Sequence, residues 1–436
     1  MKKMFFLMAF LCAIVTNSQS LGYNDLGVLF TGDDNQGTAR FRGMSGAFGA
    51  LGGDMSAITI NPAGLAVFLY SEFSTSLSFR DETIKSNYYN TSTSVSSDYT
   101  NLSQMGGVFV FKTNNSNWSR TAVGFNYNIQ RDFQSRWVAN GNSNYPTFIY
   151  DDNYTDDGDD TNDILYLNSD GQYFDNYTNG QNDKYTFSIA SQYLDNLYIG
   201  ASFTTNDIRF YQSVYLEEDN NDGNGNYLTG SLSEELTTFG SGVSFNIGVI
   251  SKPSDNIRLG LSYQSPTWYN LVEEFSSSEG FNGFDYSLRT PSKTTGSLAY
   301  IFNQSGLISL DYAYRNYRNI KLTPDYDFRE ENQTFKTDFR GTSEVRLGTE
   351  WRYKKLSFRG GYHFQQSPYD NAPSSNNLTG YSLGFGINFG FAKLDFAYEE
   401  SNQSSNYNFY PEYDNIDSAY LKNNNSIFTT TLVFSI

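Results

Sequence analysis

The sequence has almost no residues of the kinds that build metal or thiol centres. Its 436 residues include one Cys and one His, too few for a zinc site or a Cys/His catalytic pair. Basic residues are also scarce, at 29 against 47 acidic ones, so the net charge is −18. Because proteins that bind nucleic acid carry basic patches, nucleic acid is excluded as a partner. We expect neither an enzyme activity nor a cofactor.

Long apolar runs are missing as well. One run stands out, residues 4–15, but it is too short to cross a hydrocarbon core of about 30 Å as a helix. Lys2 and Lys3 precede it and small residues follow it, so residues 1–20 are predicted to be a secretory signal peptide. A short membrane anchor is the alternative. The single Cys lies within this run, so no thiol is expected in the mature chain.

Aromatic residues, in contrast, are abundant. The chain has 36 Phe, 35 Tyr and 4 Trp, which make it 17% aromatic although only 38% of it is hydrophobic. A disordered acidic chain would be poor in aromatic residues. The fold must therefore order these rings without a matching aliphatic core.

From Glu72 onward, apolar and polar residues alternate with a period of two, which is typical of β-strands. Leu347 and Trp351, for example, share one face of a segment whose other face carries Arg346 and Glu350. The sequence contains about fourteen such segments. They begin near Glu72, Asn101, Thr121, Lys184, Leu197, Leu232, Ile257, Tyr286, Leu307, Thr342, Leu356, Thr379, Lys393 and Ser426.

The connections between these segments alternate between long and short. The long ones are expected at residues 85–100, 134–183, 217–230, 270–283, 323–340, 368–377 and 401–424. The short ones are expected at residues 113–119, 195–196, 251–256, 303–306, 354–355 and 390–391. Transmembrane barrels have long external loops and tight periplasmic turns, whereas a soluble sandwich has no reason to sort its loops in this way.

The predicted fold class is therefore all-β. Residues 71–436 are expected to form a transmembrane antiparallel β-barrel of about fourteen strands with long extracellular loops. Aromatic side chains would coat the outside as girdles, and charged side chains would line the lumen. Those charges either neutralise one another in a solvated lumen or form a selectivity or ligand site. They are Arg258, Arg315, Arg346, Arg352, Arg359, Asp311, Glu344, Glu350, Asp395 and Glu399.

The last segment resembles the closing strand of bacterial barrel proteins. Thr430, Leu432, Phe434 and Ile436 share one face. The barrel assembly machinery recognises such a strand by a terminal aromatic residue, and here Phe434 stands two places before the end.

Residues 38–66 precede the first strand and do not resemble one. They read TARFRGMSGAFGALGGDMSAITINPAGLA, with glycines among small apolar residues. Glycine allows close backbone packing, and the apolar side chains need a dry environment, which a linker would not provide. We therefore predict that this segment plugs the lumen; a linker or a short surface helix is the alternative.

The same segment resembles the N-terminal hatch of the FadL/TodX family, which comprises outer-membrane transporters for long-chain fatty acids and other hydrophobic compounds. The resemblance rests on residues 39–44, residues 52–54, Ala57 and the motif Asn-Pro-Ala-Gly-Leu at 61–65. The Tyr/Asn-rich loops are similar to those of a divergent branch that is common in Bacteroidetes-like bacteria. The resemblance implies a hatch at residues 21–70 inside a fourteen-stranded barrel.

The resemblance also implies a mechanism. A hydrophobic ligand would bind beside the hatch, the hatch would shift, and the ligand would leave sideways into the membrane down its gradient. The ligand-binding residues would be Phe41, Met44, Phe48 and Leu51. The gate would be Asn61, Pro62, Ala63 and Gly64. The partners would be the ligand, outer-membrane lipid and lipopolysaccharide and the assembly machinery, with the protein a monomer of the bacterial outer membrane.

Two further features leave alternatives open. Residues 134–183 contain ten Asp and residues 217–225 read EEDNNDGNG, which suits either Ca²⁺ or a solvated, self-repelling loop. The only His, His363, falls on the lumen face and makes a poor lipase base or haem ligand. A general porin and a surface-binding barrel for haem or adhesion are the rival functions, although neither accounts for the predicted plug.

Overall fold

The computed structural model describes residues 20–113, 117–151, 164–277, 280–303 and 305–436. The predicted signal peptide, apart from Ser20, lies outside the described residues, and so does much of the acidic stretch at 152–163. Within the described part of the chain, no helix combines the length and the apolar character that crossing a membrane requires.

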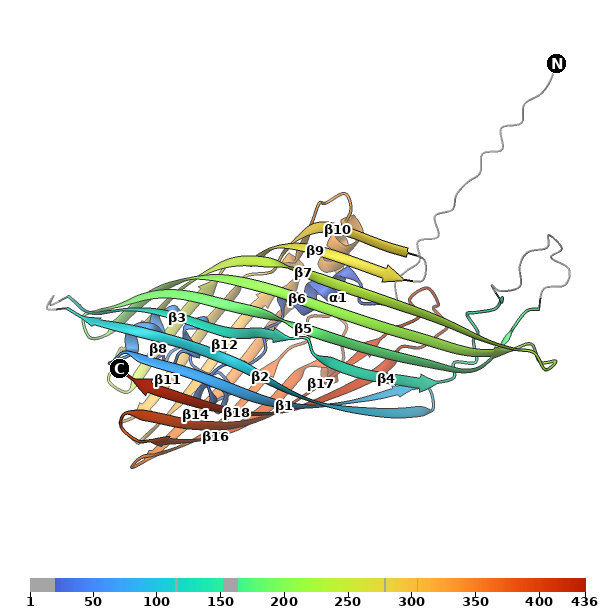
Figure 1. Cartoon of the computed structure of the whole chain (residues 1–436). Helices are drawn as coiled ribbons and strands as arrows, with labels where there is room; N and C mark the ends of the chain where they lie inside the picture. Colours follow the sequence, from blue (N-terminus) through green and yellow to red (C-terminus); the bar gives the residue numbers. More distant parts are fainter. Residues whose placement is uncertain (1–19, 114–116, 152–163, 278–279, 304) are drawn as a thin grey trace, which may run out of the picture.

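The strands form one antiparallel sheet that closes into a barrel (Figure 1). The first strand, β1 (Glu72–Tyr88), pairs with the last strand, β18 (Ala419–Ser435), and so joins the two ends of the sheet. Four of the barrel strands are interrupted, so that eighteen segments make fourteen strands. The predicted all-β fold of about fourteen strands is therefore confirmed.

Each of the fourteen predicted segments falls in a different barrel strand. After β1 the strands are β2 (Thr91–Lys112), β3 (Trp118–Asp132) with β4 (Ser135–Gly141), β5 (Asn168–Tyr193), β6 (Leu197–Asn221), β7 (Tyr227–Ser251), β8 (Ile257–Gln264) with β9 (Trp268–Ser277), β10 (Gly280–Arg289) with β11 (Lys293–Phe302), β12 (Gly306–Asn316) with β13 (Lys321–Thr323), β14 (Gly341–Tyr353), β15 (Leu356–Gln365), β16 (Leu378–Asn388) and β17 (Ala392–Tyr407).

Parts of the expected long loops are strands instead. Residues 85–100 form the end of the β1–β2 hairpin, and β5, β6 and β7 contain 26, 25 and 25 residues. A strand needs only about 9–11 residues to cross a membrane. The outer parts of these strands are rich in Asn, Asp, Ser and Tyr, because they stand in water, and this composition mimics a loop. The wall is consequently tallest at β5 to β7 (Figure 1).

Real long loops join the strands at four places, and we call this end of the barrel the mouth and the opposite end the base. The loops span residues 324–340, 366–377 and 408–418, and the connection at 142–167, of which residues 152–163 lie outside the described residues. The first of them contains the helix α3 (Arg329–Thr337) and the second contains the 3₁₀ turn η4 (Ser374–Asn376). A further 3₁₀ turn, η3 (Tyr317–Asn319), separates β12 from β13.

The two faces of the sheet differ as the alternation predicts. On β14, Leu347 and Trp351 point outward and are 45% and 44% exposed, whereas Glu350 points inward and is 1% exposed. Phe, Tyr, Leu and Ile make up most of the large exposed side chains around the whole wall. Such a surface has no packing partner in water and fits a lipid environment.

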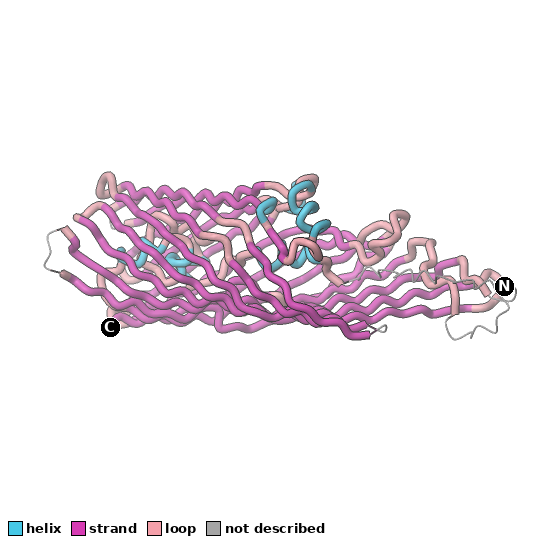
Figure 2. The backbone as a smooth tube through the Cα atoms, turned by 90° about the horizontal axis from the view of Figure 1, so that it is seen from above, coloured by secondary structure: helices cyan, strands magenta, loops and turns pink. Residues whose placement is uncertain are grey.

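Residues 20–71, the N-terminal segment, lie inside the barrel (Figure 2). The segment contains α1 (Tyr23–Thr31), α2 (Ala39–Arg42), and the 3₁₀ turns η1 (Ser56–Thr59) and η2 (Pro62–Val67). It begins near the mouth, where the Ser20 amide donates to Glu234 on β7 at 2.9 Å. It ends at the base, where the Ser71 carbonyl accepts from the Ile436 amide at 2.9 Å.

Candidate functional site

The mouth is closed from inside by a cluster of buried apolar side chains, the mouth cluster. It joins α1 to α3 and to the surrounding wall, and Gly27 packs so closely on Phe335 that a Cβ there would lie 2.7 Å from the ring. Its members are Leu26, Phe30, Phe133, Ile208, Phe210, Leu236, Tyr269, Leu271, Tyr286, Leu288, Tyr317, Ile320, Leu322, Phe328, Phe335 and Phe339. Apolar packing therefore joins the N-terminal segment to the wall at this level of the lumen.

Two buried carboxylates at the mouth hold the start of α1. The Tyr23 hydroxyl donates to Glu273 at 2.7 Å, and the Tyr369 hydroxyl donates to Asp25. Burial raises the pKa of the Asp25 carboxyl, and the hydrogen bond from Tyr369 only partly offsets this rise. These bonds leave α1 dependent on a few polar contacts in an otherwise apolar setting.

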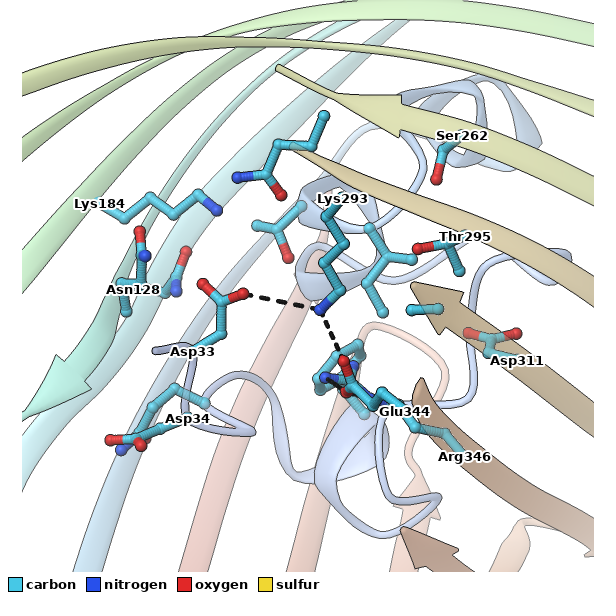
Figure 3. Close-up of a pocket in the computed structure, with 17 residues that line it drawn as sticks. Asp33, Asp34, Asn128, Lys184, Ser262, Lys293, Thr295, Asp311, Glu344 and Arg346 are labelled. Atoms are coloured by element: carbon cyan, nitrogen blue, oxygen red, sulfur yellow. Dashed lines mark hydrogen bonds and ion pairs between the residues drawn. The ribbon is translucent and has the colours of Figure 1, made fainter. Parts of the chain in front are cut away.

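Beneath the mouth cluster lies a charged cavity of about 50 Å³ (Figure 3). Lys293 bridges two carboxylates across it, with Nζ 2.8 Å from Glu344 and 3.6 Å from Asp33. Arg315 pairs with Asp33, and Arg346 pairs with Glu344. The cavity thus contains a chain of ion pairs between the N-terminal segment and the wall.

Lys184 is the exception among the cations of this cavity. It projects into the cavity from β5 and is 6% exposed, yet it forms no ion pair with any described residue. The Asp33 carboxylate acts on the charge of Lys184 without forming an ion pair. Burial of the ammonium remains costly, and an anionic ligand group bound directly to it would lower that cost. Lys184 is therefore the cation of the cavity that is best placed to bind a ligand.

Further charges of the lumen hold the N-terminal segment in place. Glu350 on β14 accepts from Arg40 of α2 at 2.8 Å and from Arg359 at 2.7 Å. Arg258 donates to the Leu51 carbonyl at 2.7 Å, and Asp311 accepts from the Gly49 amide at 2.9 Å. The expected lumen charges do pair with one another, as Arg359 does with Asp395 at 2.7 Å. The expectation of a solvated lumen is corrected, because most of these groups are buried and several also bind the segment.

The four residues predicted to bind ligand lie together, although only one of them reaches the cavity. Phe41 lines the charged cavity. Met44, Phe48 and Leu51 are buried in a separate apolar cluster with the wall residue Leu307. The Phe41 and Phe48 rings are 5.5 Å apart, so a ligand that displaced Phe41 would disturb this cluster as well. Their role in ligand binding stays a prediction.

The predicted gate residues form a turn that is pressed against the wall. Asn61 donates to the Gly49 carbonyl at 2.8 Å and to the Val249 carbonyl of β7 at 3.1 Å, and it accepts from the Ala63 amide at 3.1 Å. Pro62 is then the first residue of η2, the position that suits its fixed φ. Asn61 therefore ties the segment to the barrel.

Glycine makes this contact with the wall possible. A Cβ at Gly248 would lie 2.0 Å from Asn61 Oδ1, and a Cβ at Gly200 would lie 2.5 Å from the Pro62 carbonyl carbon. A Cβ at Gly64, the last predicted gate residue, would lie 2.9 Å from Gly52 Cα. Larger side chains would push the turn away from the wall.

The wall beside the cavity is interrupted in two neighbouring strands. β8 pairs with β11 up to Gln264 and Lys293, and β9 pairs with β10 from Trp268 and Arg289 onward. Residues 265–267 and 290–292 fall between these ladders, and each set contains a proline, which cannot donate a backbone hydrogen bond. Both Gln264 and Lys293 also line the cavity.

The sequence interpretation missed three residues of this cavity. Asp33 lies before the segment that carries the family resemblance, and neither Lys184 nor Lys293 was among the predicted lumen charges. The period-two pattern contains the signal for the lysines, since Tyr185 and Phe187 alternate with Lys184 and face outward. Asp33 carries no comparable signal because only the folded segment brings it to the wall.

In the described residues, no three His, Cys, Asp or Glu side chains gather as a metal site would require. His363 is buried in the wall on β15, facing the lumen as expected. Its neighbours there include Gly380, where a Cβ would lie 2.3 Å from the imidazole. This tight packing leaves little room for a substrate beside the imidazole.

Comparison with known proteins agrees with the geometry. No family model and no curated protein matches the sequence. Among solved structures, a FadL homologue of Pseudomonas aeruginosa has a TM-score of 0.63 and 15% identity, covering 92% of this chain and 99% of that one. The toluene transporter TodX of P. putida has a TM-score of 0.56 and 15% identity, covering 92% and 99%.

A third solved structure, the CymD monoaromatic hydrocarbon channel, has a TM-score of 0.55 and 14% identity, covering 92% of this chain and 98% of that one. These likenesses extend over nearly the whole of each chain. The chain thus has the fold of the FadL and TodX channels, as the hatch sequence predicts.

Proposed function

We propose that this protein is a channel of the bacterial outer membrane for the passive uptake of hydrophobic small molecules. The observation that carries the proposal is the order of surfaces along the lumen: an apolar mouth cluster, a closed cavity, and a segment packed across the barrel. The FadL-type fold and the apolar outer wall support the location. In this proposal residues 1–20 are removed, residues 21–70 act as the hatch and residues 71–436 form the barrel.

The charged cavity favours ligands that combine an apolar chain with an acidic head, such as long-chain fatty acids. The unpaired ammonium of Lys184 would bind the carboxylate, and Phe41 would contact the first part of the chain. Met44, Phe48 and Leu51 would line the path that opens when the hatch shifts. Transfer into lipid then favours release by about 0.8 kcal/mol for each CH₂.

Uptake by cells that produce the protein tests this ligand class. Radiolabelled oleate should enter about tenfold more slowly with Lys184→Gln, a loss of roughly 1.4 kcal/mol, whereas the neutral oleyl alcohol should enter at the same rate. Lys355→Gln, in an exposed turn at the base, is the matched control. Equal loss for both ligands would refute the head-group role, and entry of neither ligand above background in the unmodified protein would refute the function.

The gate role of residues 61–64 is tested separately. Replacing Asn61 and Pro62 with Ala removes the two wall contacts of the turn and should reduce oleate uptake while the barrel still assembles. Assembly is checked by gel electrophoresis, in which an assembled barrel resists unfolding by the detergent. Unchanged uptake in an assembled barrel would exclude the gate role.

The proposed exit is sideways, through the wall interruption at residues 265–267 and 290–292. It adjoins the cavity and is closed by neutral hydrogen bonds, in which the Thr290 amide donates to the Thr267 carbonyl at 3.0 Å and the Thr267 amide donates to Thr290 Oγ1 at 2.9 Å. The outer part of β2 forms no ladder with β4 either, but charged side chains lie beside that interruption, with Arg80 of β1 3.6 Å from Asp132 of β3. An apolar chain passes the neutral closure at the lower desolvation cost.

A reversible cross-link tests this exit. Oxidation of a Thr267→Cys/Thr290→Cys variant should stop uptake and reduction should restore it. The control is Leu259→Cys/Leu298→Cys, which joins the same two barrel strands within an intact part of the ladder. Uptake that continues through the oxidised Thr267→Cys/Thr290→Cys variant would place the exit elsewhere.

A general porin is the second candidate, because the cavity is polar and charged. Planar-bilayer recordings separate the two functions. Steady ion conductance of the purified protein would favour the porin, whereas a barrel closed by the N-terminal segment should conduct almost no ions. Monomeric protein, contact with lipopolysaccharide and recognition of the last strand by the assembly machinery remain part of the proposal.

A further inference from the structure

The outer face of the barrel carries an apolar groove of about 660 Å³, the outer groove. It crosses β5, β6, β7 and β8 in the half of the wall nearest the base. Its sides are the outward-facing residues Ile189, Ile199, Ile247 and Leu261, all 45–60% exposed. Ala201 lies between them and leaves the space open.

The inner side of the same wall holds the turn at Asn61. Gly200 and Gly248 belong to the groove and have no side chain toward the lumen, where Asn61 and Pro62 press directly on their backbone. The groove and the turn therefore lie on opposite faces of the same strands.

The groove is continuous with the lipid-facing surface of the barrel. Trp118 lies at its edge close to the base turn and is 40% exposed, which is typical of a side chain at the membrane interface. A void beside apolar side chains loses dispersion contacts, so the groove needs an apolar occupant. In a membrane, the available molecule of matching shape is a lipid chain.

We propose that the outer groove binds one acyl chain of a membrane phospholipid, at a site distinct from the transport cavity. The proposal rests on the membrane location of the barrel but not on transport. The bound chain packs against Ile199 and Ile247, on the outer face of the strands whose inner face holds the turn at Asn61.

Tryptophan quenching tests the proposal in two variants that keep one tryptophan each. One keeps Trp118, in the groove, and the other keeps Trp351, which is equally exposed near the base on β14 but outside the groove. Phosphatidylethanolamine with one dibrominated chain is titrated into detergent solutions of each variant. Trp118 should be half-quenched at about tenfold less lipid than Trp351, with saturation near one lipid per protein.

A variant in which a larger side chain fills the outer groove supplies the control. Ala201→Phe should abolish the saturable quenching of Trp118, whereas Thr349→Phe on β14 should leave it intact. Native mass spectrometry of the unmodified protein should show one retained phospholipid that Ala201→Phe loses.

Three outcomes would overturn the proposal or its basis. If Trp118 and Trp351 were half-quenched at the same lipid concentration, the proposed lipid site would be refuted. Saturable quenching by dibrominated stearic acid but not by the phospholipid would show that the groove binds the transported ligand instead. Absence of quenching of both tryptophans in vesicles made of the brominated lipid would refute the membrane location, and thus the proposed function itself.

Discussion

The two halves of the N-terminal segment are held in the barrel by different forces. The first half, α1, is held mainly by the mouth cluster, where Leu26 and Phe30 pack among other apolar side chains. The second half, residues 39–66, adds to its apolar packing the ion pair of Arg40 with Glu350 and a turn pressed onto wall glycines. A hydrophobic ligand can replace apolar packing but cannot replace buried ion pairs. We therefore expect α1 to yield before the second half does.

The strongest test of this difference is Glu350→Gln. The change removes the carboxylate shared by Arg40, Arg352 and Arg359. Arg359 keeps Asp395, but Arg40 loses its ion pair, at a cost of about 3–5 kcal/mol. The thermal midpoint of the folded barrel in detergent should fall sharply. Asp175→Asn, which removes the partner of the half-exposed Arg136, is the control and should cost less than about 1 kcal/mol. If Glu350→Gln and Asp175→Asn lowered the thermal midpoint equally, the ion pairs of Glu350 would not hold the second half of the segment more firmly than an exposed ion pair.

The next largest effect is expected for Gly248→Val. The added side chain overlaps Asn61, whose Oδ1 would lie 2.0 Å from the new Cβ, and such overpacking costs about 1–3 kcal/mol. Protease digestion should then cut residues 56–67, which the wall otherwise shields. Gly296→Val is the matched control because nothing lies within 4 Å of its Cβ position. If residues 56–67 stayed protected from the protease in both variants, the close packing of Asn61 on Gly248 would be contradicted.

A smaller effect on the barrel is expected for Phe335→Ala. It removes the ring that packs on Gly27 and should loosen α1 while the wall remains closed, because the change is confined to a local unit. Hydrogen exchange should become faster in residues 23–31 and stay unchanged in residues 39–66. Faster exchange throughout the segment would show that the two halves move together.

The smallest expected effect is a dependence on pH in α1. Burial raises the pKa of Asp25 above its ordinary value of 3.8, so the folded state holds this proton more tightly than the unfolded state. Docking of α1 should therefore be firmest in acid and weaken as the pH rises through the raised pKa. Hydrogen exchange in α1, measured from pH 4 upward, checks this dependence. Asp25→Asn should abolish it, and its persistence there would assign it to another group.

The alternation of side chains was sufficient to predict the barrel. Each inward residue of β14, such as Glu350, is preceded and followed by residues that face outward. This alternation is a property of the single strand, so it can be read from the sequence without knowing which strands lie beside it. The height of the wall could not be predicted in this way. In the outer parts of β5 to β7 the polar and apolar faces change sides: Glu217 of β6 faces outward, whereas Phe174 of β5 and Leu216 of β6 are buried in an apolar cluster inside the barrel. The outward apolar signal therefore disappears while the strands continue.

The site was less predictable than the fold. The sequence pattern correctly indicated that Phe41, Met44, Phe48 and Leu51 need a dry environment, and all four are buried. It did not indicate which of them faces the cavity, because that depends on how α2 turns between β16 and β18. The ion pairs of Asp33 were equally hidden, since they join residues more than two hundred positions apart.

The path of the N-terminal segment has a consequence for how the molecule is built. The segment enters at the mouth, runs the length of the lumen and leaves at the base, where Ser71 meets the last residue of the chain. β1 and β18 then pair along nearly their whole length and form the final seam. A segment pinned to opposite sides of the lumen by ion pairs cannot be inserted through a finished wall. The last strand must therefore close around a segment that is already in place, which makes the segment a template for the barrel as well as its plug.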